Sequence, residues 1–148
     1  MKHIVVHEVG PRDGLQMERE VVPTDTKEDW IRHMMESGVD IVQVGSFVHP
    51  VKVPQMADTD ELIQRLVKDK SSPVILAGLA LNKRGMERGL ECGVEMFALG
   101  ASASETHSMK NTGRASMDAT HRIIGAGQEA LSAGKKVQVS VQSAFGCG

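Results

Sequence analysis

The stretch IVVHEVGPRDGLQ (Ile4–Gln16) joins a short run rich in β-branched residues to a turn that contains glycine and proline. More runs of this kind follow along the chain. Each is flanked by Gly, Pro or polar residues, a pattern typical of buried parallel strands. We therefore expect strands at Ile4–Glu8, Ile41–Val44, Val74–Leu79, Met96–Leu99 and Val137–Val141.

The segments between these strands have the apolar spacing of helices. The first helix is expected to follow Thr26, which forms a capping-box-like pair with Asp29, and to end at Gly38. Further helices are expected from about Thr59 to before Pro73, from the cap Asn82 to Gly93, and from near Ser116 to Gly134.

Apolar residues at helical spacing predict the buried face of the first helix, which carries Trp30, Ile31, Met34 and Met35. The last helix contains Gly125 and Gly127. Each of these glycines lowers helix stability by roughly 1 kcal/mol relative to Ala.

Strand–helix alternation indicates an α/β fold, in which a parallel sheet is covered by helices through right-handed crossovers. Two architectures fit this pattern. An open doubly wound sheet can be complete in 148 residues. A (β/α)₈ barrel typically needs about 250 residues, so this chain would supply only its first part. Periodicity alone leaves both architectures open.

Composition narrows the class of protein. Apolar residues make up 41% of the chain, which is enough for one globular core over residues 1–148. The net charge of −2 argues against a nucleic-acid partner. No apolar stretch approaches the roughly 20 residues that span a bilayer, so no membrane partner is expected. Cys92 and Cys147 lie far apart without metal-finger spacing, which favours a reduced, cytoplasmic location.

The densest motif follows the first strand, where Arg12 and Asp13 stand between Gly10-Pro11 and Gly14. Active sites of α/β proteins form at the carboxyl ends of parallel strands. A carboxylate there can bind a divalent cation, and a guanidinium can stabilise a developing oxyanion. An ion pair that merely closes the loop fits the same residues, and the pattern does not decide between the two.

A second cluster, QVGSFVHP (Gln43–Pro50), follows the second strand. Strand alternation places Gln43 and Gly45 on one face, with Ser46 just beyond the strand. The Ser46 hydroxyl has two candidate roles, a hydrogen bond to a substrate carbonyl or carboxylate, and a turn-forming bond. No GxSxG motif surrounds it, which excludes a serine hydrolase of that type.

Other polar residues have weaker signals. Asp58 and Thr59 are interpreted as helix caps, and Cys147 as a small buried residue at a strand end. Glu105 and Asn111 follow the fourth strand, where they either reach a ligand or belong to a solvated loop. The histidines show no HxH or HExxH pairing, so adjacent motifs do not assemble a complete metal site.

Four motifs in this order, EVGPRDGLQ, GSFVHPVKVPQMAD, GASASETHSMKN and VQSAFGCG, resemble the N-terminal half of the 3-hydroxy-3-methylglutaryl-CoA lyase family. The resemblance runs from about His7 to Gly148. It implies a pyruvate-carboxyltransferase-like (β/α)₈ TIM barrel, of which this chain supplies about five strands and four helices. The simplest explanation is a fragment of a roughly 300-residue enzyme, inactive by itself.

The resemblance also implies the chemistry. The family cleaves 3-hydroxy-3-methylglutaryl-CoA to acetyl-CoA and acetoacetate, a step of leucine degradation and ketone-body metabolism. It implies that Asp13 ligates Mg²⁺ or Mn²⁺ and that Arg12 stabilises the enolate oxygen. Gln16 and Ser46 would line the acyl pocket, and Asn111 would contact the acyl-CoA substrate. A homo-oligomer is expected for the full-length protein.

Gln43 departs from this family, which has a glutamate at the corresponding position. An amide forms hydrogen bonds but carries no charge and accepts no proton. The family's other metal ligands, a His-x-His pair and an asparagine, lie on later strands, as does a catalytic loop cysteine. Two alternatives therefore remain: a related aldol-type enzyme with another acyl-CoA or 2-oxo acid substrate, and an inactive half-barrel that acts as a binding module.

Overall fold

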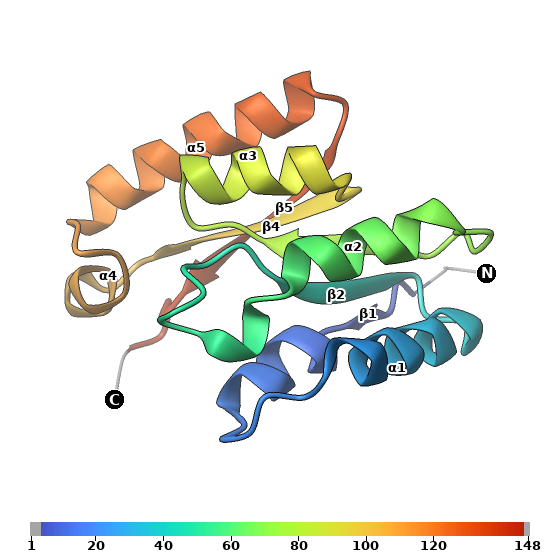
Figure 1. Cartoon of the computed structure of the whole chain (residues 1–148). Coiled ribbons are helices and arrows are strands. Elements are labelled where there is room, and N and C mark those ends of the chain that lie inside the picture. Colours follow the sequence, from blue (N-terminus) through green and yellow to red (C-terminus); the bar gives the residue numbers. More distant parts are fainter. Residues whose placement is uncertain (1–3, 147–148) are drawn as a thin grey trace.

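The computed structural model describes residues 4–146, and in it a curved parallel sheet carries its helices on one face (Figure 1). The strands are β1 (His7–Glu8), β2 (Ile41–Ser46), β3 (Ile75–Leu79), β4 (Met96–Ser102) and β5 (Lys136–Gln142). The helices are α1 (Thr24–Glu36), α2 (Thr59–Lys68), α3 (Lys83–Cys92), α4 (Glu105–Thr112) and α5 (Ser116–Ser132).

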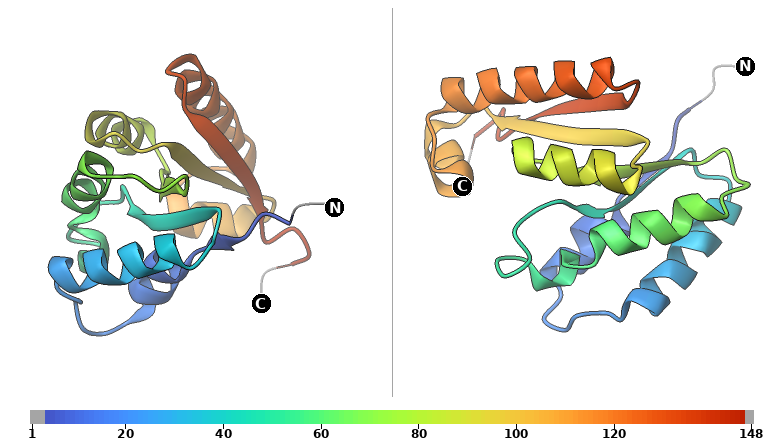
Figure 2. Two further views of the ribbon diagram at one scale, coloured as in Figure 1. Left: turned by 90° about the vertical axis from the view of Figure 1, so that its right-hand side faces the viewer. Right: turned by 45° about the horizontal axis from the view of Figure 1, so that its top comes forward.

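Neighbouring strands in the sheet follow the order of the chain, β1-β2-β3-β4-β5, and every pair is parallel. A doubly wound sheet reverses its strand order at a switch point, whereas a barrel adds each strand next to the last. The sheet also curls, with α1, α2, α3 and α5 along its outer side (Figure 2). The fold is therefore a half-barrel.

All five predicted strands are present, with shifted ends. Pairing with β2 begins only at His7, so the predicted first strand starts too early, at Ile4. The predicted helix ends are confirmed at Gly38, Gly93 and Gly134, which all have a left-handed backbone. Asn82 caps α3 by accepting a hydrogen bond from the Gly85 amide.

Three expectations about helices are wrong. The first helix starts at Thr24, so Thr26 lies inside it and forms no capping box with Asp29. Trp30 is 46% exposed, because it lies beside the turn after β1 instead of in the core. Helix α4 occupies part of the region expected to be a loop. Among the described residues, no helix has the length and apolar character needed to cross a membrane.

The core lies between the helices and the outer face of the sheet. Alternate strand residues point outward into it, and they meet one apolar face of each covering helix. Its largest fully buried members include Ile31, Leu62, Ile63, Leu66, Leu76, Met86, Phe97 and Leu99. The opposite, concave face of the sheet is left for the candidate site.

Glycines from β3 and α3 surround the buried ring of Phe47. A Cβ placed on Gly78 would lie 2.6 Å from this ring, and one on Gly85 would lie 2.9 Å from the Phe47 carbonyl oxygen. At Gly89 a Cβ would lie 2.4 Å from Phe97 and 2.8 Å from Phe47. Both rings are buried, so neither can move aside easily. Helix α3 therefore approaches the sheet closely because its contact residues lack side chains.

Gly89→Ala is expected to destabilise the fold by about 2 kcal/mol, because overpacking costs about 1–3 kcal/mol and the gain in helix propensity offsets only part of it. Gly125→Ala is the matched control, since a Cβ there meets no atom within 4 Å. This control should gain about 0.5–1 kcal/mol. Urea denaturation measures the free energy of unfolding of both variants. Changes of the same sign in Gly89→Ala and Gly125→Ala, relative to the wild type, would contradict the packing argument.

Candidate active site

Arg12, Asp13 and Gln16, from the turns after β1, form one hydrogen-bonded cluster with Gln43 in the middle of β2. The Arg12 Nε donates to Gln43 Oε1 at 2.5 Å, and Nη1 donates to Asp13 Oδ1 at 2.6 Å. Gln16 Nε2 donates to the same Asp13 oxygen at 2.9 Å. Gln43 is 3% exposed, whereas the Asp13 side chain is 56% exposed. The cluster thus holds a fixed guanidinium beside a carboxylate that faces solvent.

The turn η1 (Gly10–Gly14) sets this arrangement. The amides of Arg12 and Asp13 both donate to the Val9 carbonyl, which closes the turn directly after β1. Glu8 Oε1 accepts from the Gly10 amide at 2.6 Å, and a Cβ on Gly10 would lie 2.9 Å from that oxygen. Glycine at this position therefore lets Glu8 fasten the turn, a role that the sequence patterns did not reveal.

Ser46 reaches the concave face through an irregularity in β2. The register with β3 shifts between Gln43 and Gly45, which is a β-bulge. A Cβ on Gly45 would lie 2.4 Å from Thr59 of α2, so Gly45 faces the helices and not the Gln43 side. The expectation that Gln43 and Gly45 share a face is therefore wrong. Ser46 is the last residue of β2 and not, as expected, a residue beyond the strand. It pairs with Leu79, which lines a cavity on the concave face.

A cavity of about 190 Å³ lies on the concave face beside Arg12 and Gln43. The residues that line it are His7, Val9, Arg12, Gln43, Leu79, Ala98, Leu99, Gln138, Ser140 and Gln142. Sequence reasoning missed His7 and the polar residues of β5. The strand KVQVSVQ (Lys136–Gln142) does carry a signal, because every second residue from Gln138 onward is polar and uncharged.

Asn111 and Glu105 lie on α4, outside the lining of this cavity. The Asn111 amide is within 2.9 Å of His107 Nε2, and the other ring nitrogen of His107 is 2.5 Å from Ser102 Oγ. Glu105 accepts a hydrogen bond from the Ser116 amide, which ties α4 to α5. The structure therefore does not bring Asn111 together with the Arg12 cluster. The expectation for Cys147 lies outside the described residues.

Asp58, interpreted from the sequence as a helix cap, makes no capping hydrogen bond with its side chain. Its carboxylate instead accepts from Lys27 Nζ at 2.8 Å and from Thr24 Oγ1 at 2.9 Å. Lys27 also donates to the Gln55 carbonyl at 2.5 Å. This buried ion pair joins α1 to the loop that follows β2.

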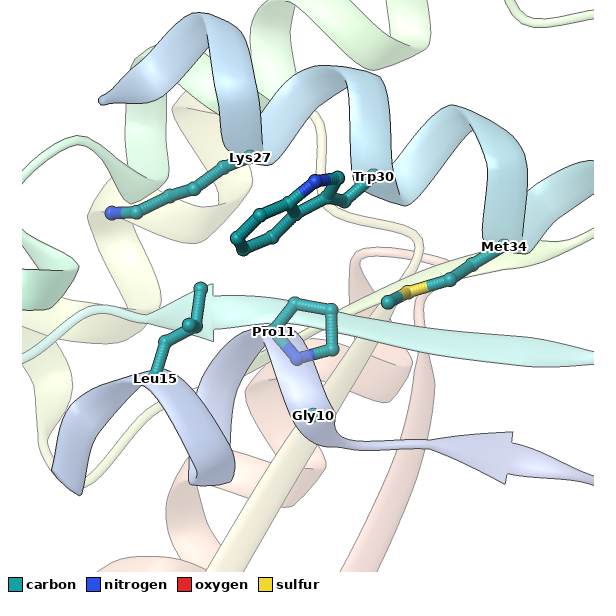
Figure 3. Close-up of a pocket in the computed structure, with 6 residues that line it drawn as sticks. All are labelled: Gly10, Pro11, Leu15, Lys27, Trp30 and Met34. Carbon is teal, nitrogen blue, oxygen red and sulfur yellow. The ribbon is translucent and has the colours of Figure 1, made fainter. Parts of the chain in front are cut away.

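A second cavity, of about 210 Å³, lies between η1 and α1 on the outer side of the turn. Figure 3 shows Trp30 and Met34 of α1 facing Pro11 and Leu15. Its wall is almost wholly apolar, and the ammonium group of Lys27, which also lines it, is paired with Asp58. These contacts support the turn that carries Arg12.

His7 faces the first cavity from β1. Burial is the main cause that lowers the pKa of its imidazole below 6.5, and the nearby Gln138 offsets part of this lowering. The imidazole therefore binds a proton more readily in the unfolded chain than in the folded chain. As a result, the free energy of unfolding decreases as the pH falls through 6.5.

Unfolding free energies at pH 7.5 and 5.5 are expected to differ less in His7→Gln than in the wild type. The exposed His121→Gln serves as control and should keep the wild-type pH dependence. An identical pH dependence for the wild type and His7→Gln would contradict this prediction.

Asp13 offers a divalent cation one carboxylate. Both of its hydrogen bonds use Oδ1. Within residues 4–146, no three His, Cys, Asp or Glu side chains are grouped so that they could hold a metal ion. Magnesium sites often use one or two carboxylates together with water and substrate oxygens. Asp13 supplies one carboxylate ligand of the kind that such a magnesium site uses, so the described residues fit part of the site.

The family model described as HMGL-like matches residues 3–147. The chain belongs to the HMGL-like family. The hydroxymethylglutaryl-CoA lyase YngG of Bacillus subtilis is 33% identical over 146 residues, which cover 99% of this chain and 48% of that protein. The 3-hydroxy-3-isohexenylglutaryl-CoA/hydroxymethylglutaryl-CoA lyase of Pseudomonas aeruginosa is 36% identical, with 99% and 47% covered.

Solved structures of HMGL-like proteins match the fold. The HMG-CoA lyase of Bacillus subtilis superposes with a TM-score of 0.92 at 33% identity, over 99% of this chain and 49% of that one. An HMG-CoA lyase from Acinetobacter baumannii, solved with coenzyme A and 3-methylmalate, gives a TM-score of 0.87 at 31% identity, over 97% and 46%. The chain thus spans about half the length of these HMGL-like relatives, and the barrel expectation is confirmed over the open sheet.

Proposed function

We propose that this chain carries the enolate-stabilising residues of a divalent-cation-dependent carbon–carbon lyase. The substrate would be 3-hydroxy-3-methylglutaryl-CoA, and the products acetyl-CoA and acetoacetate. The observation that carries the proposal is the Arg12 guanidinium, held by Gln43 and Asp13 at the edge of a cavity on the concave face. Membership of the HMGL-like family and the names of its lyases support this choice of reaction.

The reaction places specific demands on the site. The C3 hydroxyl loses its proton, the C2–C3 bond breaks, and the electron pair moves onto the thioester as an enolate before C2 is protonated. Negative charge therefore accumulates on the thioester oxygen. A positive group that is already fixed in place stabilises this charge without reorganisation. Arg12 meets that requirement, because two side chains orient it and its side chain is only 18% exposed.

Asp13 would ligate the cation, with Gln16 and Arg12 holding the carboxylate in place through Oδ1. Mg²⁺ or Mn²⁺ bound there would act as a Lewis acid toward substrate oxygens. Gln43 and Ser46 would hydrogen-bond the acyl group from β2. Asn111 on α4 would contact the acyl-CoA outside the cavity. The coenzyme A in the Acinetobacter baumannii structure supports an acyl-CoA ligand.

The test is acetyl-CoA release from 3-hydroxy-3-methylglutaryl-CoA by the protein expressed from its complete gene. Activity should disappear in EDTA and return with Mg²⁺ or Mn²⁺. Asp13→Asn should lose most of it, while the exposed Asp29→Asn on α1 should keep it. Turnover that survives EDTA and Asp13→Asn would contradict the role of the cation. Absence of any acetyl-CoA would contradict the substrate.

Gln43 favours a second candidate, a related aldol-type enzyme with another acyl-CoA or a 2-oxo acid. Its amide accepts a hydrogen bond from Arg12 but cannot neutralise the guanidinium or take a proton. Gln43→Glu discriminates between the two. Activity on the methylglutaryl substrate that rises strongly in this variant would favour the second candidate.

A further inference from the structure

The concave face carries polar side chains that the proposed chemistry leaves without a role. The register pairs Gln138 with Ala98, Ser140 with Gly100 and Gln142 with Ser102. A Cβ on Gly100 would lie 2.8 Å from Gln142 Nε2 and 3.1 Å from Ser140 Oγ. Small residues on β4 thus leave the space that the β5 side chains occupy, so β5 presents a row of hydrogen-bonding groups to the cavity.

His7 faces this row from the opposite end of the sheet. Its Nε2 atom is buried and has no hydrogen-bond partner among the described residues. Gln138 lines the same cavity as His7, although β1 and β5 are the first and last strands of the half-barrel. The two side chains therefore meet across the concave face. An unpaired buried nitrogen is a site that a bound hydroxyl or carbonyl group would satisfy.

The cavity is small and nearly uncharged. Arg12 is the one permanently charged residue among the ten that line it. Its volume of about 190 Å³ is below the roughly 300–1,000 Å³ of pockets that take drug-sized ligands. Such a cavity suits one anionic oxygen on Arg12 and neutral oxygens elsewhere. A bulky apolar group would leave the amides of β5 unpaired, which is unfavourable.

We propose that His7 and Gln138 are specificity-determining residues, which meet across the concave face and select a short, hydroxyl-bearing anionic acyl group over an apolar one. The proposal rests on the proposed function, because it places the acyl group beside Arg12. It adds a selection step on β1 and β5 that the enolate chemistry does not require.

The experiment is an NMR titration of the ¹⁵N-labelled full chain with 3-hydroxy-3-methylglutarate and, separately, with hexanoate. The hydroxy acid should shift the side-chain amide signals of Gln43, Gln138 and Gln142, and hexanoate should bind at least about tenfold more weakly. In His7→Val and in Gln138→Leu, that preference should fall to about threefold or less.

Controls separate this proposal from the proposed function. His121→Val and Gln128→Leu, on the exposed face of α5, should keep the wild-type preference. Arg12→Gln should abolish binding of both acids. Gln138 is exposed, so Gln138→Leu tests the idea even where His7→Val fails to fold. Arg12-dependent binding with an unchanged preference in Gln138→Leu would overturn the specificity proposal alone. Absence of binding by the wild-type chain would overturn both.

Discussion

Replacing Arg12 by Gln is expected to lower kcat/KM for cleavage of 3-hydroxy-3-methylglutaryl-CoA by about 10²- to 10³-fold, the usual effect of removing one oxyanion-stabilising donor. Glutamine can still bond Gln43, so the turn after β1 should keep its shape. The loss should appear mainly in kcat, because the negative charge on the thioester oxygen develops only as the C2–C3 bond breaks.

Two further variants sharpen this test in the protein expressed from its complete gene. Arg12→Lys keeps the charge but loses the paired geometry with Gln43 and Asp13. Its activity should therefore lie between that of the wild type and that of Arg12→Gln. Arg84→Gln, an exposed change on α3, should match the wild type. Thermal melting confirms that each variant folds. Turnover of Arg12→Gln within about threefold of the wild type would refute the role of the guanidinium.

Lys27→Met is expected to destabilise the chain by about 3 kcal/mol, which is the lower end of the cost of breaking a buried ion pair. The Lys27 side chain is 3% exposed and that of Asp58 is 17% exposed. Methionine replaces the aliphatic stem of Lys27 but leaves the Asp58 carboxylate and the Gln55 carbonyl without their donor. Partial access of water to Asp58 keeps the loss below the upper end of the range.

Urea denaturation measures this loss against a matched control. Lys83→Met removes an exposed lysine whose partner Glu87 is 4.0 Å away within the same helix, so it should change stability by no more than about 0.5 kcal/mol. The double variant Lys27→Met/Asp58→Asn should recover part of the loss, because it also removes the unpaired charge. Equal stabilities for Lys27→Met and Lys83→Met would show that the ion pair contributes nothing.

The fold was largely predictable because its signals are local. Each buried strand is a short apolar run, and helices α1, α3 and α5 are each followed closely by a glycine that takes a left-handed backbone. Helix α4 was missed because its sequence ETHSMKNT lacks an apolar face, and Ser108 is its buried residue. Trp30 was misplaced because periodicity identifies an apolar helix face without showing whether a core or a turn covers it.

The candidate site was predictable only in part. Arg12, Asp13 and Gln16 are neighbours in sequence, and their turn follows a recognisable strand. The bulge before Gly45 depends on the partner strand and on Thr59 of α2, so alternation within β2 could not reveal it. His7 and Gln138 are separated by most of the chain. Their meeting depends on the curvature of the whole sheet, which a linear pattern does not record.

The ring of Phe47 also restricts how this sequence can change. Gly78 of β3 has no room for a side chain because this ring occupies the space, and at Gly89 of α3 the rings of Phe97 and Phe47 both do so. The effects on stability of substitutions at residues in contact are not additive. Alanine at Gly78 would become tolerable once a smaller residue replaced Phe47, while Phe47→Leu alone would leave a void. These positions form an epistatic group in which the order of substitutions decides whether an evolutionary path stays open.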